Sequence, residues 1–384
     1  MGKQLLSHKK VEYIELVYDL IFVYLVKRCD NLLVMEPSGF FSWASFDVYL
    51  FSCLVIMQIW VYSTLFINRY GQNGWAEHLL LIVNMFLLCF LATDTRNDWW
   101  AIYGQYQTAW GLILINQLLH YLRQLRRTHN VREQHFLIRR TVIFAIQTLM
   151  VFLAVPIYEQ TGFSLAWPAL AVGFIAPLVL LSLDRDVPTN IEHLAERVML
   201  FVVLSFGETI ISAAEYFEGG LTFETVYFAA CAFAIVIGML LGYGFAYNKL
   251  LDKRRMGVGT RYMLVHVPLI VAINDVTVGL EYMHEGESND FLTLLFLVVS
   301  FLIFYAALLW LAHRAGKYYL PARQTWLPFI IISAIFAATA FCFTSNRWIN
   351  AAISVVYPYA MYAAILLRKR QERKEHPDIS AEEL

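Results

Sequence analysis

Stretches of about 20 apolar residues recur from one end of the chain to the other, and this repetition limits the possible folds more than any other feature. A helix needs roughly 20 apolar residues to cross the ~30 Å hydrocarbon core of a bilayer. Of the 384 residues, 59% are hydrophobic and 15% are charged, against about 45–50% and about 25% in ordinary soluble domains. The sequence therefore predicts an all-α fold, a polytopic integral membrane helix bundle.

We predict twelve membrane-spanning helices, each built on one of these apolar stretches. The stretch at 163–182 is the most interrupted, because it contains Pro168 and Pro177. The predicted spans are 11–34, 42–67, 75–94, 99–122, 136–157, 163–182, 191–216, 221–247, 261–283, 290–312, 326–344 and 348–367.

The distribution of basic residues tests this number independently, because one helix more or fewer would invert every later loop. With the N-terminus in the cytoplasm, 25 of the 29 Lys and Arg residues fall on the inner side, and only Lys27, Arg28, Arg96 and Arg347 fall outside. Cytoplasmic loops of membrane proteins carry an excess of Lys and Arg. We expect a membrane protein with both termini in the cytoplasm, the lipid bilayer as its partner, and no nucleic-acid partner.

A faint internal repeat divides the spans into two groups of six. The pattern V-Y-x-x-x-C begins at Val48 and again at Val226, which is 178 residues later. Six spans in each half would give a parallel repeat, with halves at 1–185 and 186–370 and a cytoplasmic tail at 371–384. Chance matches of this length are common, so the repeat stays an open alternative to an unrepeated bundle.

Polar side chains inside the apolar spans are the candidates for function, since they are costly in lipid and usually face the interior of the bundle. Glu15 and Asp19 are four residues apart, which places them on one face of the first span. Two carboxylates near the bilayer centre would cost roughly 5–7 kcal/mol. The candidates for binding a substrate or ion are Glu15, Asp19, Glu196, Arg197, Glu208, His266 and Asp275.

The seventh span predicts an ion pair with another helix. Glu196 and Arg197 are consecutive, so they lie on different faces, and we expect Arg197 to pair with Glu15 or Asp19. The alternative is that these groups only stabilise helix packing, as interhelical polar contacts often do.

Metal and cofactor sites are not indicated by the sequence. His193 and Glu196 are three residues apart and would suit a metal, but no further well-placed His accompanies them. The chain also lacks HExxH, Walker A and GxSxG motifs. We predict no metal and no cofactor, and the sequence gives no support to an enzyme.

Three runs of residues resemble the bacterial low temperature requirement A family. They are Glu15-Leu16-Val17-Tyr18-Asp19-Leu20-Ile21-Phe22-Val23, His193-Leu194-Ala195-Glu196-Arg197 with the later Gly207-Glu208, and His266-Val267-Pro268 with the later Gly279-Leu280-Glu281. The resemblance extends over nearly the whole chain and implies a multispanning protein of the bacterial cytoplasmic membrane associated with growth in the cold. Val267 and the polar pair Asn274-Asp275 depart from the expected pattern, which leaves the role of Asp275 open.

The leading functional hypothesis is a secondary transporter, in which carboxylates of the first and seventh spans bind a proton or cation and a central cavity carries a small-molecule substrate. Two alternatives stay open. One is an intramembrane enzyme or a lipid-binding factor for membrane adaptation. The other is a scaffold or sensor that transports nothing and uses its carboxylates structurally.

Overall fold

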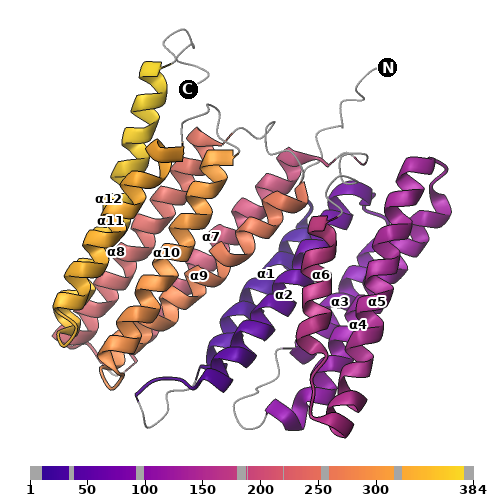
Figure 1. Cartoon of the computed structure of the whole chain (residues 1–384), viewed down its shortest axis with the longest axis horizontal. Helices are drawn as coiled ribbons and strands as arrows, with labels where there is room; N and C mark the ends of the chain where they lie inside the picture. Colours follow the sequence, from indigo (N-terminus) through magenta and orange to yellow (C-terminus); the bar gives the residue numbers. More distant parts are fainter. Residues whose placement is uncertain are drawn as a thin grey trace. The chain divides into compact units, whose positions relative to one another are not determined.

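The computed structural model describes residues 11–33, 39–91, 99–179, 187, 189–218, 220–251, 259–314 and 322–375, and the side chains of 322–325 and 371–375 lie outside this description. These residues form α-helices joined by short connections (Figure 1). The elements are α1 (Tyr13–Arg28), η1 (Cys29–Leu32), α2 (Trp43–Tyr70), α3 (Trp75–Leu91), α4 (Trp99–Arg127), α5 (Val131–Thr161), α6 (Ala166–Val179), α7 (Ile191–Glu215), α8 (Phe223–Phe245), η3 (Ala246–Leu250), α9 (Gly259–Glu285), α10 (Asp290–Arg314), α11 (Ala322–Cys342) and α12 (Arg347–Glu375).

Each predicted span overlaps one of these α-helices, in the same order, and the all-α prediction is confirmed for the described residues. Seven of the helices, α2, α5, α7, α8, α9, α10 and α12, are long and apolar enough to cross a membrane. The apolar helices α3, α6 and the part of α11 after Trp326 are shorter. The chain is therefore a multispanning membrane protein.

Several helices run further than the predicted spans. α5 starts at Val131 instead of 136, and α12 continues to Glu375 instead of ending at 367. Apolar length measures the part of a helix inside the hydrocarbon, but the backbone hydrogen bonds continue into the charged segments beyond it. The predicted tail after 375 lies outside the described residues.

The chain packs as two compact units, and each is described by itself. The first contains α1 to α6 with the start of α7, up to Phe201, and the start of α9, up to Leu264. The second contains the rest of α7 and α9 with α8, α10, α11 and α12. This division follows packing, and the predicted halves at 1–185 and 186–370 stay a prediction.

The faces of α1 are reversed relative to a helix of a soluble protein. Glu15 and Asp19 are buried, whereas Leu16, Val17 and Leu20 on the other side are 38%, 48% and 48% exposed. A helix of a soluble protein turns its apolar face inward. A helix in lipid turns its ionisable side chains toward the interior of the bundle. α1 therefore brings two carboxylates into the first unit and leaves an apolar face for the bilayer.

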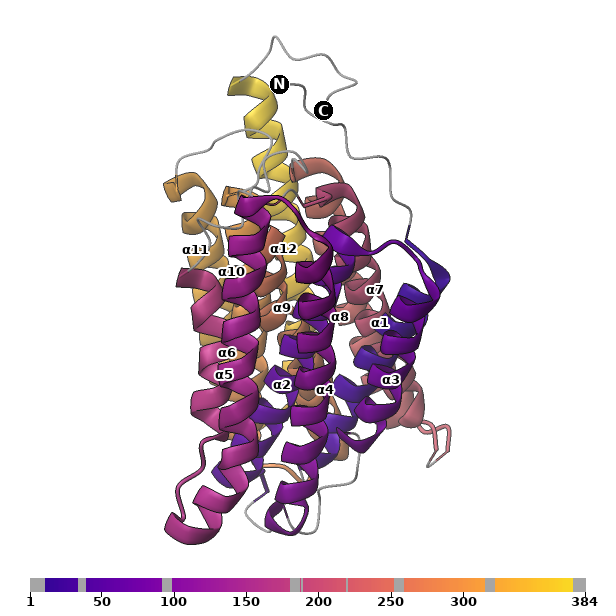
Figure 2. The ribbon, with the colours of Figure 1, turned by 90° about the vertical axis from the view of Figure 1, so that its right-hand side faces the viewer.

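A close approach between α2 and α6 holds the middle of the first unit together, beside the α4–α5 hairpin whose helices run side by side (Figure 2). The Tyr62 hydroxyl donates to the Gly173 carbonyl, and the Gln58 amide donates to the Leu170 carbonyl at 3.0 Å. A Cβ at position 173 would lie 2.2 Å from Gln58 Nε2. A larger residue there would displace the Gln58 amide from its hydrogen bond to the Leu170 carbonyl, and α2 carries part of the site described below.

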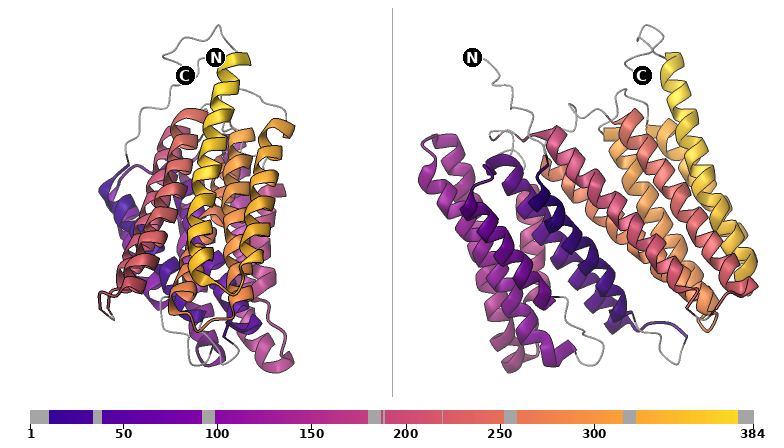
Figure 3. Two further views of the ribbon diagram at one scale, coloured as in Figure 1. Left: turned by 90° about the vertical axis from the view of Figure 1, so that its left-hand side faces the viewer. Right: turned by 180° about the vertical axis from the view of Figure 1, so that it is seen from behind.

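In the second unit, α8 and α12 lie side by side (Figure 3). Arg347 at the start of α12 forms an ion pair with Glu224 at the start of α8. Its guanidinium also donates to the carbonyl of His284, at 2.7 Å, near the end of α9. Carbonyls at a helix end have no partner within the helix, so this one arginine ties the ends of three helices.

Candidate functional site

A fully buried ion pair joins α1 to α7. Arg197 Nε donates to Asp19 Oδ2 at 3.0 Å, and Arg197 Nη2 donates to Asp19 Oδ1 at 2.5 Å. The indole of Trp60, on α2, donates a third hydrogen bond to Asp19 Oδ1 at 2.8 Å. The fork of the guanidinium matches the two carboxylate oxygens, which is the strongest geometry for such a pair. Asp19 therefore has every hydrogen bond that an ionised carboxylate needs in a buried site.

A second carboxylate lies one helical turn away on α1. Glu15 Oε2 is 3.0 Å from His193 Nε2 and 3.4 Å from Arg197 Nη1. His193 and Arg197 are four residues apart on α7, just as Glu15 and Asp19 are on α1, so the two helices present matching pairs of groups. The four side chains Glu15, Asp19, His193 and Arg197 are called here the buried ion cluster.

The hydrogen bonds of Asn68, at the end of α2, determine which nitrogen of His193 carries the proton. Asn68 Oδ1 accepts from the backbone N–H of Asn190 at 3.0 Å, so the NH₂ group is on the other side of the amide. That NH₂ donates to the Asn190 carbonyl at 2.8 Å and lies 3.0 Å from His193 Nδ1. Because an NH₂ group can only donate, Nδ1 accepts, and the proton of a neutral ring is on Nε2, the nitrogen that lies 3.0 Å from Glu15 Oε2.

The charges of the buried ion cluster then do not cancel. With His193 neutral and both carboxylates ionised, the sum is −1, because Arg197 supplies the only positive charge of the four. One proton on Glu15 brings the sum to zero and leaves each hydrogen bond described above intact. Protonation of His193 would instead break the bond from Asn68 to Nδ1. Glu15 is therefore the member of the cluster that could carry an added proton without the loss of one of these hydrogen bonds.

The structure places three of the seven candidate residues in the cluster. The predicted pairing of Arg197 with Glu15 or Asp19 is confirmed, since Arg197 contacts both. Glu196 follows the helix to a different face of α7 and is half-buried. Glu208 is also half-buried and lies about 16 Å further along α7, in the part assigned to the second unit.

The ninth-span candidates belong to the second unit as well. His266 is fully buried, and its Nε2 lies 3.4 Å from the Tyr243 hydroxyl on α8. Asp275 is buried nine residues further along α9. Neither is a member of the buried ion cluster, which combines residues of the first two sequence motifs.

Two groups that orient the cluster were missed by the sequence analysis, namely Trp60 and Asn68. A tryptophan in an apolar span looks like a packing residue, and nothing in its sequence position indicates that its N–H meets a carboxylate. Asn68 lies at the end of an apolar span, where polar residues are expected anyway. Their roles depend on which helices are neighbours, which the helical period of one span does not specify.

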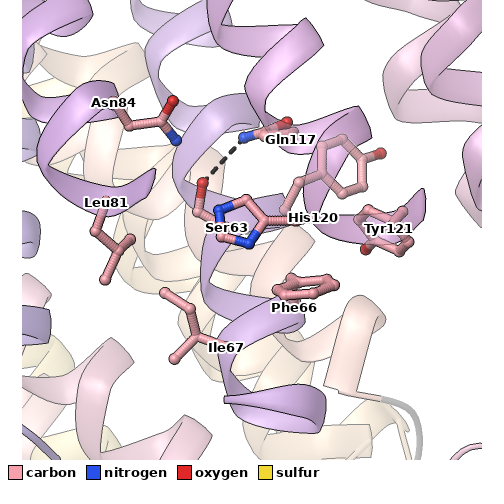
Figure 4. A pocket seen from close by; sticks show the side chains of 9 residues that line it. Ser63, Phe66, Ile67, Leu81, Asn84, Gln117, His120 and Tyr121 are labelled. Atoms are coloured by element: carbon pink, nitrogen blue, oxygen red, sulfur yellow. Dashed lines mark hydrogen bonds between the residues drawn. The ribbon is translucent and has the colours of Figure 1, made fainter. Parts of the chain in front are cut away.

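A small cavity with a mostly apolar lining surface lies near the cluster in the first unit, between α2, α3 and α4 (Figure 4). Its volume is about 10 Å³, and Ser63, Asn84, Gln117 and His120 are its polar lining residues. Gln117 donates to the Ser63 hydroxyl at 2.9 Å. A cavity of this size with several polar partners is close to the smallest that holds one water molecule.

No group of three or more His, Cys, Asp or Glu side chains within the described ranges is arranged to hold a metal ion. His193 and Glu196, which the sequence analysis considered as two metal donors, differ in burial, since His193 is 1% exposed and Glu196 is half-buried. His193 is occupied by Glu15 and Asn68.

The comparisons with known proteins agree with the sequence resemblance. The family described as bacterial low temperature requirement A protein (LtrA) matches residues 10–361, which is nearly the whole chain. A relative from Rhizobium meliloti (strain 1021), described as uncharacterized protein RA0937, is 22% identical over 375 residues and covers 88% of each chain. No solved structure matches the chain.

Proposed function

The chain belongs to the bacterial low temperature requirement A family of membrane proteins, and we propose that it is a proton-linked secondary transporter of the bacterial cytoplasmic membrane. In this proposal Glu15 is the proton-binding carboxylate, and Asp19 is held ionised by Arg197. The substrate is a small molecule whose passage is linked to the protonation of Glu15. The protein has twelve spans and both termini in the cytoplasm.

The observation that supports this function is the charge sum of the buried ion cluster. A net charge of −1 among side chains that are at most 1% exposed is costly in a low-dielectric interior. A proton removes that cost, and its release restores it, so protonation of Glu15 changes the energy of the contact between α1 and α7. A group that couples proton binding to helix packing is what a proton-linked transporter requires.

The spacing of the ion pairs supports the two-repeat organisation. Asp19 and Arg197 are 178 residues apart, and so are Glu15 and His193, since 193 − 15 = 178. The V-Y-x-x-x-C pattern recurs at the same distance. When two copies of a segment meet around a two-fold axis, residues on that axis contact their own equivalents. The repeated helices α1 and α7 would then carry carboxylates in one copy and a histidine and an arginine in the other.

The test uses purified protein in liposomes and measures dissipation of a pH gradient across candidate substrate pools. Glu15→Gln keeps the size and the acceptor oxygen for His193 but removes the titrating group, so we expect it to fold and to lose proton-linked flux. Asp19→Asn should lose proton-linked flux and should also lower the stability of the fold, because the amide cannot pair with Arg197 as a carboxylate does. Glu192→Gln is the matched control, since Glu192 precedes His193 on α7 and is exposed. It should behave as the wild type does.

Wild-type flux in a folded Glu15→Gln variant would overturn the proton-linked function. If that variant also supported growth in the cold as well as the wild type does, the cluster would be structural. The remaining alternatives would then be a lipid-binding factor for membrane adaptation or a scaffold.

A further inference from the structure

A second cavity of the first unit adjoins the small cavity between α2, α3 and α4. It is larger, about 60 Å³, and lies where α2 and α4 end and α3 begins. Glu77, Arg123 and Arg127 are among its lining residues, and both arginines are exposed. Arginines at the end of a membrane helix are typical of its water-facing end. The charge pattern assigns this end to the cytoplasm.

The two cavities share Phe66 and His120 as lining residues. The two rings are in contact, with centroids 4.9 Å apart, and each residue is 8% exposed. These side chains therefore separate the two cavities. We call the larger one, lined by Glu77, Arg123 and Arg127, the outer cavity. The smaller one, lined by Ser63, Asn84 and Gln117, is the inner cavity.

Hydrogen bonds continue from the inner cavity to α1. The Tyr18 hydroxyl donates to Ser63 at 2.9 Å and accepts from Asn84 at 3.2 Å. Figure 4 shows the side chains of Ser63, Asn84 and Gln117 grouped at one side of the cavity. Hydroxyl groups can donate and accept at the same time, so Tyr18 and Ser63 are able to pass a proton along.

Tyr18 belongs to this network and is a neighbour of the buried ion cluster along α1. It is three residues from Glu15, on the same face of α1, and it precedes Asp19 directly. Arg197 interacts electrostatically with the Tyr18 phenol. Polar packing alone would explain the hydrogen bonds, but it would not require two cavities in line between the cluster and the charged helix ends.

We propose that this line of cavities and hydroxyl groups is the one-sided entry path for water and protons from the cytoplasm to Glu15, with Phe66 and His120 as its gate. The proposal rests on the proposed function for its purpose. It can be tested without any transport measurement, because water access to the inner cavity is a property of the first unit alone.

The experiment introduces a thiol at the inner cavity and measures its reaction with silver ion, a small charged probe added on the cytoplasmic side of proteoliposomes. Silver binds the thiolate and releases its proton, and the thiols that remain are counted with a maleimide after denaturation. The protein carries Ser63→Cys, with its five native cysteines replaced by alanine. Thr64→Cys is the matched control, since Thr64 is the next residue on α2 and is fully buried but does not line either cavity.

We expect Ser63→Cys to react at least about tenfold faster than Thr64→Cys, because only the former meets a cavity able to hold water. Adding His120→Trp should slow the reaction, and adding Phe66→Ala should accelerate it, so the gate is tested in both directions. Equal slow reaction of Ser63→Cys and Thr64→Cys would overturn the path, and unchanged rates in both gate variants would overturn the gate. Fast, gated reaction in a protein without proton flux would support the path and reject the proposed transport.

Discussion

Asp19 and Arg197 are 178 residues apart in the chain, yet Arg197 donates two hydrogen bonds to the two oxygens of the Asp19 carboxylate, at 3.0 and 2.5 Å. Both side chains are 0% exposed. In a buried pair of this kind the desolvation cost of each ion is offset by its partner, so the loss of one member leaves an uncompensated charge. The pair therefore makes the packing of α1 against α7 depend on both residues.

Arg197→Ala should destabilise the protein strongly. Removal of one partner of a buried pair typically costs about 3–5 kcal/mol, and here it leaves both Asp19 and Glu15 without their arginine. Thermal unfolding in detergent should show a clearly lower midpoint than the wild type. Arg139→Ala is the control, because Arg139 is exposed on α5 and should change the midpoint little.

The double variant Asp19→Ala/Arg197→Ala separates the pair from simple loss of packing. The double variant no longer has the Asp19 carboxylate, whose charge is uncompensated in Arg197→Ala. It should therefore be more stable than Arg197→Ala alone. A double variant that is less stable than either single variant would contradict the role assigned to the pair.

The candidate site could be predicted only where one helix carries its residues. The four-residue spacing of Glu15 and Asp19 places them on one face, and a buried face of carboxylates requires a cation. Arg197 lies within the seventh predicted span, so the pair could be predicted. The hydrogen bond between Asn68 and His193 joins residues 125 apart in the chain. Nothing in either apolar span indicates that contact, since it depends on tertiary packing.

The helices could be predicted from apolar length, but their ends could not. α12 continues to Glu375 through a charged segment, although the predicted span ends at 367. The apolar pattern marks the hydrocarbon boundary and gives no information beyond it. α6 is short, with 14 residues, and here Pro168 and Pro177 gave the correct indication that this span was unusual.

The twelve-span topology predicts the side of each loop. His129 lies between α4 and α5 in a loop that the basic residues assign to the cytoplasm, and Glu287 lies between α9 and α10 on the opposite side. Both positions are exposed, and each is replaced by cysteine in turn. A cysteine at position 129 should react with an impermeant maleimide only in inverted vesicles. A cysteine at position 287 should react only in intact cells. Labelling of both positions from the same side would rule out the topology.

Gly286→Ala should destabilise the second unit more than Gly162→Ala destabilises the first. Both glycines have positive φ, +71° and +72°, so both variants pay a similar backbone strain of about 1 kcal/mol. A Cβ at position 162 meets nothing within 4 Å, whereas one at position 286 would lie 2.1 Å from Arg347 Nη1. Gly286→Ala should therefore lower the free energy of unfolding by about 1–3 kcal/mol more than Gly162→Ala does, because the hydrogen bonds of Arg347 are displaced. This difference should vanish when Arg347 is also replaced by alanine. Chemical denaturation in detergent measures each difference.

The last prediction concerns the proton of His193. Because Asn68 donates to Nδ1, the neutral ring should carry its proton on Nε2, the nitrogen nearer to Glu15. Nitrogen NMR of protein with ¹⁵N-labelled histidine distinguishes the two nitrogens, and the His193→Gln variant identifies the signal. Asn68→Leu removes the donor, so the preference for Nε2 should weaken or disappear. A wild-type signal from a ring protonated on both nitrogens at neutral pH would place the exchangeable proton on His193 and contradict its assignment to Glu15.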